Sequence, residues 1–555
     1  MTEPPLRPPS VVMPIAALGA IKPHRLSFAR LLVRRMTEDR WSITLAECDV
    51  DGDGVGQMVY LIEADGYQLY FAIRSDNVPE ELRTGRLSES RFDGMGILCH
   101  GPLDWEQLDE EMQQIQRRSG GRGSHRSLGW TLCSRSSRSF DHVVDALSRG
   151  AQPSVEALIE GAPYLVRNNG YYGNGRHGTR PWASLPGDHP LAQPYFPEMF
   201  SLYMWRQYGY DLVEQMARQR SPDAVALEPG LKRYLGVGNA TGQGMSTFLT
   251  KWPHWIHGWN SIRETAFART AAIRPARDDL RRTVELLDRV RVTYELDRRG
   301  DDGVFPPSDV LAAGIATLIS YLSDKSPFVW SEAIDWSETQ LHDEVVNVFR
   351  GVLTEVYAEM VDDLAEGYKP LMSMPRAISP ATTIAELRAE LDEYDWIWPL
   401  SGEPGFHKRF FYRSEEHGEQ RVGERSIDEG AQNETFTGVV ELLRSLSYTA
   451  RDRDERETIA RFLIDAPEQR FAVERVMSLR DFPYAEVRAD ITASDWTPGQ
   501  ASRFVLATFG MEMTRAHTDR WVQGVFLQGA PLPIELADGV DRDWLYPHPP
   551  IPVPS

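Results

Sequence analysis

Two glycine-rich segments contain the residue types that could carry out chemistry. Residues 167–182 include four glycines, three asparagines, two tyrosines, three arginines and one histidine within sixteen positions. Apolar residues in this segment follow neither a helical nor a strand period, which predicts a loop. Loops that are held by a rigid scaffold commonly carry binding and catalytic residues. We therefore interpret residues 167–182 as a candidate functional site.

The side chains of this segment suit acid/base chemistry on an anionic compound. Histidine titrates near neutral pH and tyrosine can donate or relay a proton, which makes His177, Tyr172 and Tyr171 the candidate catalytic residues. Arginine can hold a carboxylate or phosphate through paired hydrogen bonds, and asparagine offers a donor and an acceptor. The expected substrate-binding residues of this segment are Asn168, Asn169, Asn174, Arg176 and Arg180. The alternative is a structural loop whose polar groups satisfy helix ends and buried carbonyls.

The second segment, residues 236–249, carries four glycines and continues into a helical pattern. A glycine-rich turn that opens a helix directs backbone N–H donors at an anion. Asn239, Thr241 and Gln243 are the ligand-binding residues that we expect here. The segment lacks a nucleotide signature, because Met245 follows the last glycine where a phosphate-binding loop needs lysine. Close helix packing against the glycines is the alternative.

We expect the two segments to line one pocket. A single long helix, which starts near Pro197 and ends near Arg220, separates them, so the chain could return alongside its origin. A separation of tens of ångströms between residues 168–180 and 238–245 would contradict the single-site hypothesis.

Neither a metal ion nor an organic cofactor is expected. His254, His257 and Glu264 could share one helical face, but a proline and a glycine interrupt that helix and neighbouring tryptophans favour packing. The acidic turn at residues 49–54 matches the start of a calcium loop, yet Tyr60 stands at its twelfth position instead of glutamate. We interpret this turn as an ordinary acidic hairpin.

Composition excludes several classes of protein. The 81 acidic and 60 basic residues give a formal charge of -21, which repels nucleic acid and anionic membrane surfaces. Three scattered cysteines favour a reducing compartment. We find neither a signal peptide nor an apolar run of 18 residues, so we expect a cytoplasmic protein.

The rest of the chain must position the two segments, and its sequence pattern predicts an α+β fold that is mainly α-helical. Residues 41–75 alternate with period two, which predicts a small N-terminal antiparallel meander of three strands. A short helix with Ser27 as its N-cap precedes the meander. A large helical body follows, with helices expected around 105–118, 138–149, 197–220, 244–270, 274–298, 308–323, 339–366, 384–393, 435–450, 454–464 and 467–479.

We divide the chain into seven parts from these patterns. They are a Pro-rich tail (1–22), a β-rich unit (23–104), a helical unit with both candidate segments (105–275), a helical unit (276–400), a polar loop (401–434), a C-terminal helical unit (435–540) and a Pro-rich tail (541–555). Both tails are expected to run as extended chain over a surface.

Three motifs together resemble a broad group of bacterial proteins of similar length. They are Tyr172-Gly-Asn-Gly, Gly236-Val-Gly-Asn-Ala-Thr-Gly-Gln-Gly-Met and Gln528-Gly-Ala-Pro-Leu-Pro. The resemblance spans most of the chain and favours treating 23–535 as one evolutionary unit. It implies no particular activity.

The residues favour an enzyme that needs no organic cofactor. The hypothesis is a lyase of aromatic compound catabolism that breaks a carbon–carbon or carbon–oxygen bond in a small anionic or phenolic aromatic compound, with a homodimer as the expected assembly. One alternative is a transferase or hydrolase that places a nucleotide or phosphate on the turn at 236–244. The other is a non-enzymatic interaction protein. Neither nucleic acid nor a membrane is an expected partner.

Overall fold

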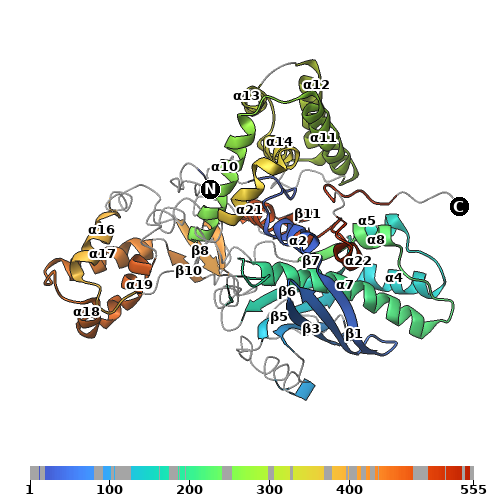
Figure 1. Ribbon diagram of the computed structural model, residues 1–555, viewed down its shortest axis with the longest axis horizontal. Coiled ribbons are helices and arrows are strands. Elements are labelled where there is room, and N and C mark those ends of the chain that lie inside the picture. The colour runs from blue at the N-terminus through green and yellow to red at the C-terminus, as the bar shows by residue number, and fades with distance from the viewer. Residues whose placement is uncertain are drawn as a thin grey trace. The chain divides into compact units, whose positions relative to one another are not determined.

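The structure is a computed structural model in which the chain divides into two compact units (Figure 1). The sheet unit comprises Gly19–Gly242, Phe267–Ala365 and Arg503–Ser555, and the second unit comprises Met1–Leu18, Gln243–Ala266 and Glu366–Ser502. The structure describes residues 12, 19–79, 92–101, 105–106, 110, 127–161, 163–173, 185–186, 188–193, 195–239, 253–297, 306–325, 329–367, 378–394, 398, 409–413, 420–424, 432–435, 437–478, 498–518, 521–540 and 544–550.

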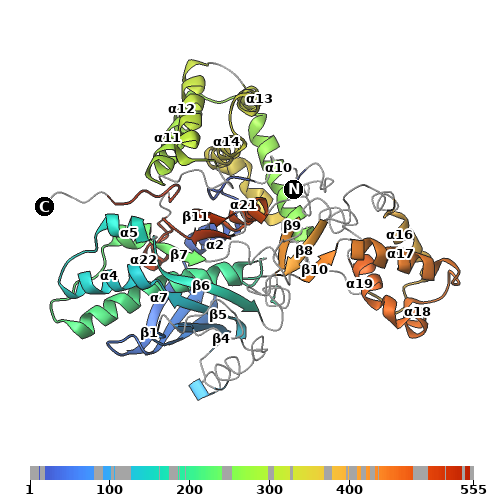
Figure 2. The ribbon, with the colours of Figure 1, turned by 180° about the vertical axis from the view of Figure 1, so that it is seen from behind.

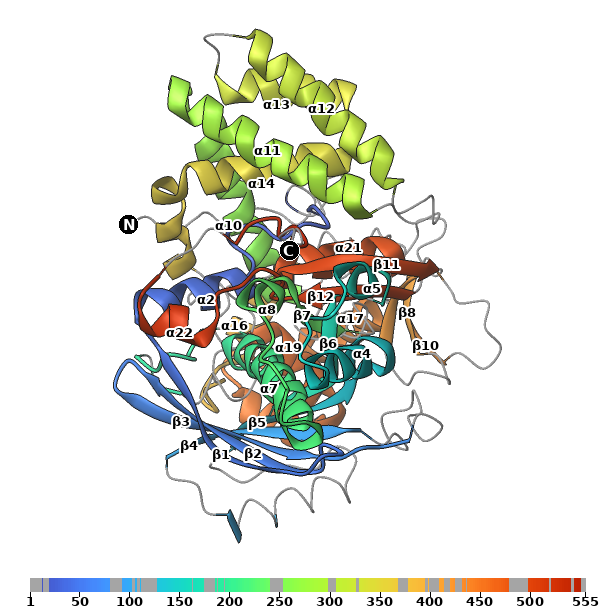
Figure 3. The same cartoon turned by 90° about the vertical axis from the view of Figure 1, so that its right-hand side faces the viewer.

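A nine-stranded sheet is the centre of the sheet unit, with strand order β1-β2-β3-β4-β5-β6-β7-β12-β11 (Figure 3). The strands are β1 (Ser42–Val50), β2 (Gly56–Ala64), β3 (Tyr67–Ser75), β4 (Gly94–His100), β5 (Ser127–Arg135), β6 (Tyr164–Gly173), β7 (Gly236–Asn239), β11 (Met511–Thr518) and β12 (Trp521–Phe526). Neighbouring strands are antiparallel except for β6 and β7, which are parallel. The expected fold class, α+β with an N-terminal meander, is confirmed.

The meander β1-β2-β3 lies where it was expected and is antiparallel. Its alternating residues place Met58, Tyr60 and Ile62 of β2 in the interior. The acidic turn between β1 and β2 is a hairpin turn, as expected. There the Asp51 carboxylate accepts hydrogen bonds from the backbone N–H groups of Asp53 and Val55, both at 2.9 Å.

Helix α7 (Phe196–Arg220) lies against one face of this sheet and contacts β1, β4, β5, β6 and β7 (Figure 3). Its Trp205 is completely buried. Glycines of β4 make room for that indole, since a Cβ atom at either Gly94 or Gly96 would lie 3.0 Å from the Trp205 ring. The indole N–H donates to Thr131 Oγ at 3.1 Å. The long helix expected between Pro197 and Arg220 is therefore confirmed, and it covers the strands that carry the candidate site.

Arg206, also on α7, is a buried clamp for two distant segments. Its guanidinium donates to five backbone carbonyls, those of Lys232, Arg233, Leu235, Ala530 and Pro531, at 2.8–3.3 Å. These carbonyls precede β7 on one side and belong to the 528–533 motif on the other. The clamp therefore fixes the start of β7.

Several of the other helices lie close to the expected ranges, whereas those at 155–161, 229–234, 330–340, 498–509 and 533–537 were not expected. In the sheet unit they are α2 (Phe28–Glu38), α4 (Ser137–Ser148), α5 (Val155–Gly161), α8 (Pro229–Tyr234), α11 (Arg277–Asp297), α12 (Ser308–Asp324), α13 (Trp330–Gln340), α14 (Asp343–Val356) and α22 (Pro533–Ala537), with the 3-10 turn η4 (Ala358–Met360). A further 3-10 turn, η5 (Asp362–Gly367), begins in the sheet unit and ends in the second unit. Two helices, α10 (Pro253–Ala271) and α21 (Pro498–Phe509), have residues in both units. Ser27 stands at the N-cap of α2, as expected, without a side-chain cap bond.

The second unit contains a small sheet and a helical core (Figure 2). Its elements are β8 (Arg409–Arg413), β9 (Gln420–Glu424), β10 (Gln432–Thr435), α16 (Ile384–Asp392), α17 (Thr437–Arg451), α18 (Ile459–Asp465), η9 (Pro467–Gln469) and α19 (Arg470–Ser478). The expectation of a polar loop at 401–434 is thus wrong for the described residues, which form three paired strands. Leu387, Leu446 and Phe462 are fully buried where α16, α17 and α18 meet.

Two further expectations need correction. The segment 435–540, expected to be helical, also supplies β11 and β12, because these strands extend the main sheet beyond β7. The N-terminal tail does not stay on the surface at its described end: Lys22 is buried and pairs with Glu512 at 3.0 Å. The C-terminal residues 544–550 form neither helix nor strand, as expected. Within the described residues, no helix has the length and apolarity that crossing a bilayer requires.

A pair of histidines attaches the connection before α7 to the end of β4. His189 is completely buried, its Nδ1 accepts from the Leu191 N–H at 3.0 Å, and its Nε2 lies 2.9 Å from Nε2 of His100. The first bond places the His189 proton on Nε2, so His100 accepts through Nε2 and is also neutral. Burial lowers the pKa of both rings, and the neighbouring His100 and Arg35 help to lower that of His189 to about 4 although Asp188 opposes the shift.

We expect this pair to make the fold sensitive to acid. Because the folded-state pKa of His189 lies below the unfolded value of about 6.5, the unfolded chain takes up the proton first. Stability is therefore complete above pH 6.5 and falls as the pH drops toward 4. From pH 7.5 to 5.0 His189 should cost about 2 kcal/mol in the free energy of unfolding, measured with urea. His189→Gln, which can still donate to His100, should remove that part of the pH dependence, whereas the exposed His548→Gln should not. Equal pH dependence in all three proteins would contradict the assignment.

Candidate functional site

The first candidate segment begins as a strand and not as a loop. Residues 164–173 form β6, which pairs with β5 from Val166↔Arg135 to Gly173↔Gly129. The sequence misleads because β6 is a central strand in which the polar side chain of Asn168 is hydrogen-bonded inside the fold. Asn168, which is buried, donates through Nδ2 to Thr131 Oγ at 2.6 Å and to the Leu132 carbonyl at 3.2 Å.

The second candidate segment also begins as a strand. Residues 236–239, expected in a turn that opens a helix, form β7 between β6 and β12. Its glycines are required by close packing: a Cβ at Gly236 would lie 2.3 Å from the Phe526 carbonyl, and one at Gly238 would lie 2.7 Å from the Tyr164 ring. Glycine packing, weighed as an alternative, therefore explains these two residues, although the contacts are with strands and an aromatic ring instead of a helix.

Parallel pairing brings the two segments together, which confirms the expected convergence. The register pairs Arg167 with Gly238 and Asn168 with Asn239. The described residues of β7 reach Asn239, and β6 continues beside β5 as far as Gly173. The crossover that joins β6 to β7 contains α7.

Arg167 is the cation that the structure places at this junction. It pairs with Ser134 of β5 and Gly238 of β7, and its Nε is buried with no acceptor among the described residues. Adjacent strand residues point to opposite faces, so Arg167 lies on the face opposite Asn168 and α7. Arg167 lies in the first candidate segment, but the sequence pattern gave no reason to assign it a function.

Several predicted site residues lie outside the described residues. These are Asn174, Arg176, His177, Arg180, Thr241 and Gln243. For Asn169, Tyr171 and Tyr172 the structure describes the backbone, which belongs to β6. Asn239 is buried in β7. Their catalytic and binding roles stay predictions.

The described residues contain no group of three or more side chains that could hold a metal ion. The side chains of His254 and His257 lie outside the described residues. Glu264, their proposed companion, has its carboxylate 3.7 Å from the guanidinium of Arg263.

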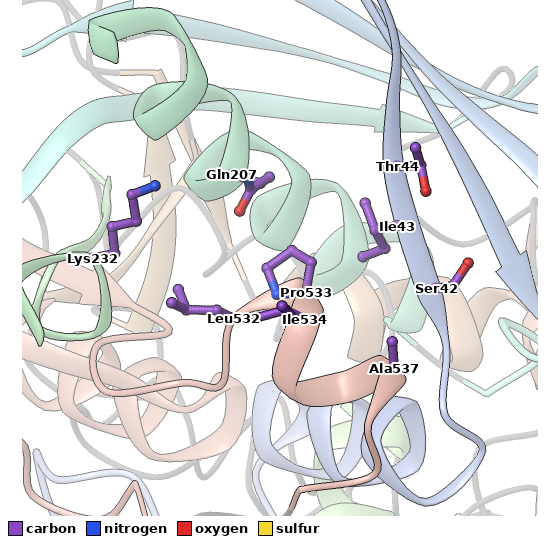
Figure 4. Close-up of a pocket in the computed structure, with 9 residues that line it drawn as sticks. All are labelled: Ser42, Ile43, Thr44, Gln207, Lys232, Leu532, Pro533, Ile534 and Ala537. Atoms are coloured by element: carbon purple, nitrogen blue, oxygen red, sulfur yellow. The ribbon is translucent and has the colours of Figure 1, made fainter. Parts of the chain in front are cut away.

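Away from this junction, a pocket of about 390 Å³ opens between β1, α7, α8 and α22 (Figure 4). Its lining comes from Ser42, Ile43, Thr44, Gln207, Lys232, Leu532, Pro533, Ile534 and Ala537. Lys232 lies on the N-terminal side of β7, whereas the candidate segments meet at its C-terminal end. The sequence did not point to this pocket, because its walls come from four separate parts of the chain.

Comparison with known proteins leaves the chain without an assigned family. No protein-family model, curated protein or solved structure matches it.

Proposed function

We propose that this protein is an enzyme that binds a small anionic compound where β6 and β7 end and acts on it by acid/base chemistry. The observation that carries the proposal is the parallel pairing of Asn168 with Asn239, which starts both candidate segments from the same place in the sheet. Ligands of sheets with parallel strands commonly bind beyond the carboxyl ends of the strands, where crossover connections diverge.

Charge at the junction supports an anion as the ligand. The Arg167 guanidinium has a buried donor without an acceptor among the described residues, and such a group is costly unless something pairs with it. Arg176 and Arg180 follow within the same segment, and His177 with Tyr172 supplies groups that transfer protons. These residue types favour a lyase without an organic cofactor, acting on a phenolic or other aromatic anion.

A ligand screen by thermal unfolding tests the proposal. Phenolic acids such as 4-hydroxybenzoate should raise the melting temperature, because a ligand at 100 times its Kd adds about 2.7 kcal/mol to stability. Arg167→Met should abolish this stabilisation, and the exposed Arg149→Met at the end of α4 should preserve it.

The screen also separates the alternatives. Stabilisation by nucleotides and not by phenolic acids would favour a phosphate- or nucleotide-binding transferase or hydrolase. No stabilisation by either class would contradict the enzyme proposal and favour a non-enzymatic interaction protein. Ligand binding that is unchanged in Arg167→Met would place the site elsewhere.

A further inference from the structure

The pocket beside β1 has one apolar wall and one polar end. Leu532 and Pro533 of the 528–533 motif, with Ile43 and Ala537, form the apolar wall. At the polar end, the Lys232 ammonium and the Gln207 side-chain oxygen both lie above Leu532 and Pro533 (Figure 4). A volume near 390 Å³ is at the lower end of the range for small-molecule sites, which is about 300–1,000 Å³. The shape therefore suits a compact ligand.

The orientation of the Gln207 amide is fixed by its neighbour. Its Nε2 donates to Asp211 Oδ2 at 2.9 Å, and that same oxygen accepts the Tyr60 hydroxyl at 2.8 Å. A carboxylate only accepts hydrogen bonds, so the NH₂ group of Gln207 must face Asp211 and its oxygen must face away. The pocket thus has one hydrogen-bond acceptor in a set position.

The Lys232 ammonium can donate hydrogen bonds to a ligand, and its positive charge is already paired with the Glu214 carboxylate. One of its three N–H groups is used by Glu214 Oε1 at 2.6 Å, and no other acceptor is found for it in the described part of the chain. Glu214 pairs with the lysine, and the Asp211 carboxylate accepts from Gln207 at the same end of the pocket. Glu214 also lies 3.7 Å from the Arg218 guanidinium, so the two carboxylates and the two cations balance, and the Gln207 oxygen would repel an anionic ligand at the polar end.

We propose that this pocket binds a small neutral primary amide with a compact apolar body. The amide carbonyl accepts from Lys232, the amide NH₂ donates to the Gln207 oxygen, and the apolar body lies against Ile43, Leu532 and Pro533. A free compound fits better than a glutamine or asparagine side chain, because those side chains carry no apolar body to cover this wall. The site is separate from the β6-β7 junction and does not depend on the function proposed there.

Three matched probes test the recognition of the amide on the full-length protein. The three probes share a phenyl ring and differ in their polar group. Benzamide offers a hydrogen-bond donor and an acceptor, N,N-dimethylbenzamide offers an acceptor alone, and benzoate offers a charged acceptor. Their dissociation constants are measured by ligand-observed NMR titration. Benzamide should bind at least about five-fold more tightly than either analogue. N,N-dimethylbenzamide lacks the N–H donor of one hydrogen bond of about 1 kcal/mol, and benzoate brings a negative charge next to the Gln207 oxygen and the carboxylates.

Two variants locate the binding. Ala537→Phe, which fills the apolar end, should abolish benzamide binding, and Lys232→Met should weaken it about five-fold or more. The exposed Lys325→Met, at the end of α12, should leave it unchanged. Lys232→Met keeps the test valid if Ala537→Phe fails to fold. Benzoate binding as tightly as benzamide, no binding of any probe, or equal binding in Lys232→Met and Lys325→Met would overturn the proposal.

Discussion

Replacing Arg206 by methionine is expected to lower the free energy of unfolding by about 3–5 kcal/mol. The Arg206 side chain is buried and makes five hydrogen bonds to backbone carbonyls, each assisted by its charge. The Tyr210 hydroxyl lies within hydrogen-bond distance of the Leu235 and Lys232 carbonyls and would keep a bond to one of them, and Tyr203 would keep its bond to Pro531. No other bond to the Ala530 carbonyl is found in the described residues. The variant should therefore loosen β7 and the 528–533 motif together.

Urea unfolding followed by tryptophan fluorescence measures this change. Arg218→Met is the matched control, because Arg218 lies on the same helix with 56% of its side chain exposed and should change stability by no more than about 0.5 kcal/mol. Arg206→Lys should be intermediate, since an ammonium has three donors and cannot reach all five carbonyls. A loss of less than about 1 kcal/mol in Arg206→Met would mean that the clamp does not hold these segments.

The His177→Ala variant should lose a factor of roughly 10² to 10⁴ in the rate of turnover once a substrate has been found by the ligand screen. His177 lies between Arg176 and Gly178 in a stretch without an apolar period, so we expect no packing role for it. Neighbouring cations favour the neutral ring, which can act as a base. The melting temperature should therefore change by only a few degrees.

Tyr172→Phe separates two roles of the tyrosine in the same assay. A loss similar to that of His177→Ala is expected if the hydroxyl relays a proton, and a smaller loss if the ring only stacks on the substrate. Steady-state rates and thermal unfolding are measured for both variants. Unfolding of His177→Ala, or full activity in it, would show that the catalytic assignment is wrong and that the segment is structural.

Local patterns in the sequence determined the elements whose burial has a simple period. The alternation between residues 41 and 75 predicted β1, β2 and β3, although only β2 and β3 bury much of their length and β1 is largely exposed. The apolar spacing over 274–298 predicted α11 because one face of that helix is buried, whereas α7, predicted from 197–220, is buried on all sides in its first half. The long helix also predicted correctly that the two candidate segments would converge.

Tertiary structure alone decided that those segments begin as strands. Asn168 breaks the apolar period of β6, yet its amide is satisfied by Thr131 and Leu132, residues more than thirty positions away. Gly236 and Gly238 indicate a turn when taken by themselves. In the fold they are the residues small enough to lie against Phe526 and Tyr164.

The buried polar groups and the pocket depend on the same kind of distant contact. In the sequence, nothing distinguishes Arg206 from an ordinary arginine in a helix. Only its hydrogen bonds to the carbonyls of residues 232–235 and 530–531 make it a clamp. The pocket needs Ser42 to Thr44, Gln207, Lys232 and the 532–537 segment at one place. A sequence pattern reports what lies one turn or two residues away, whereas these features are created by groups that the chain brings together from hundreds of residues apart.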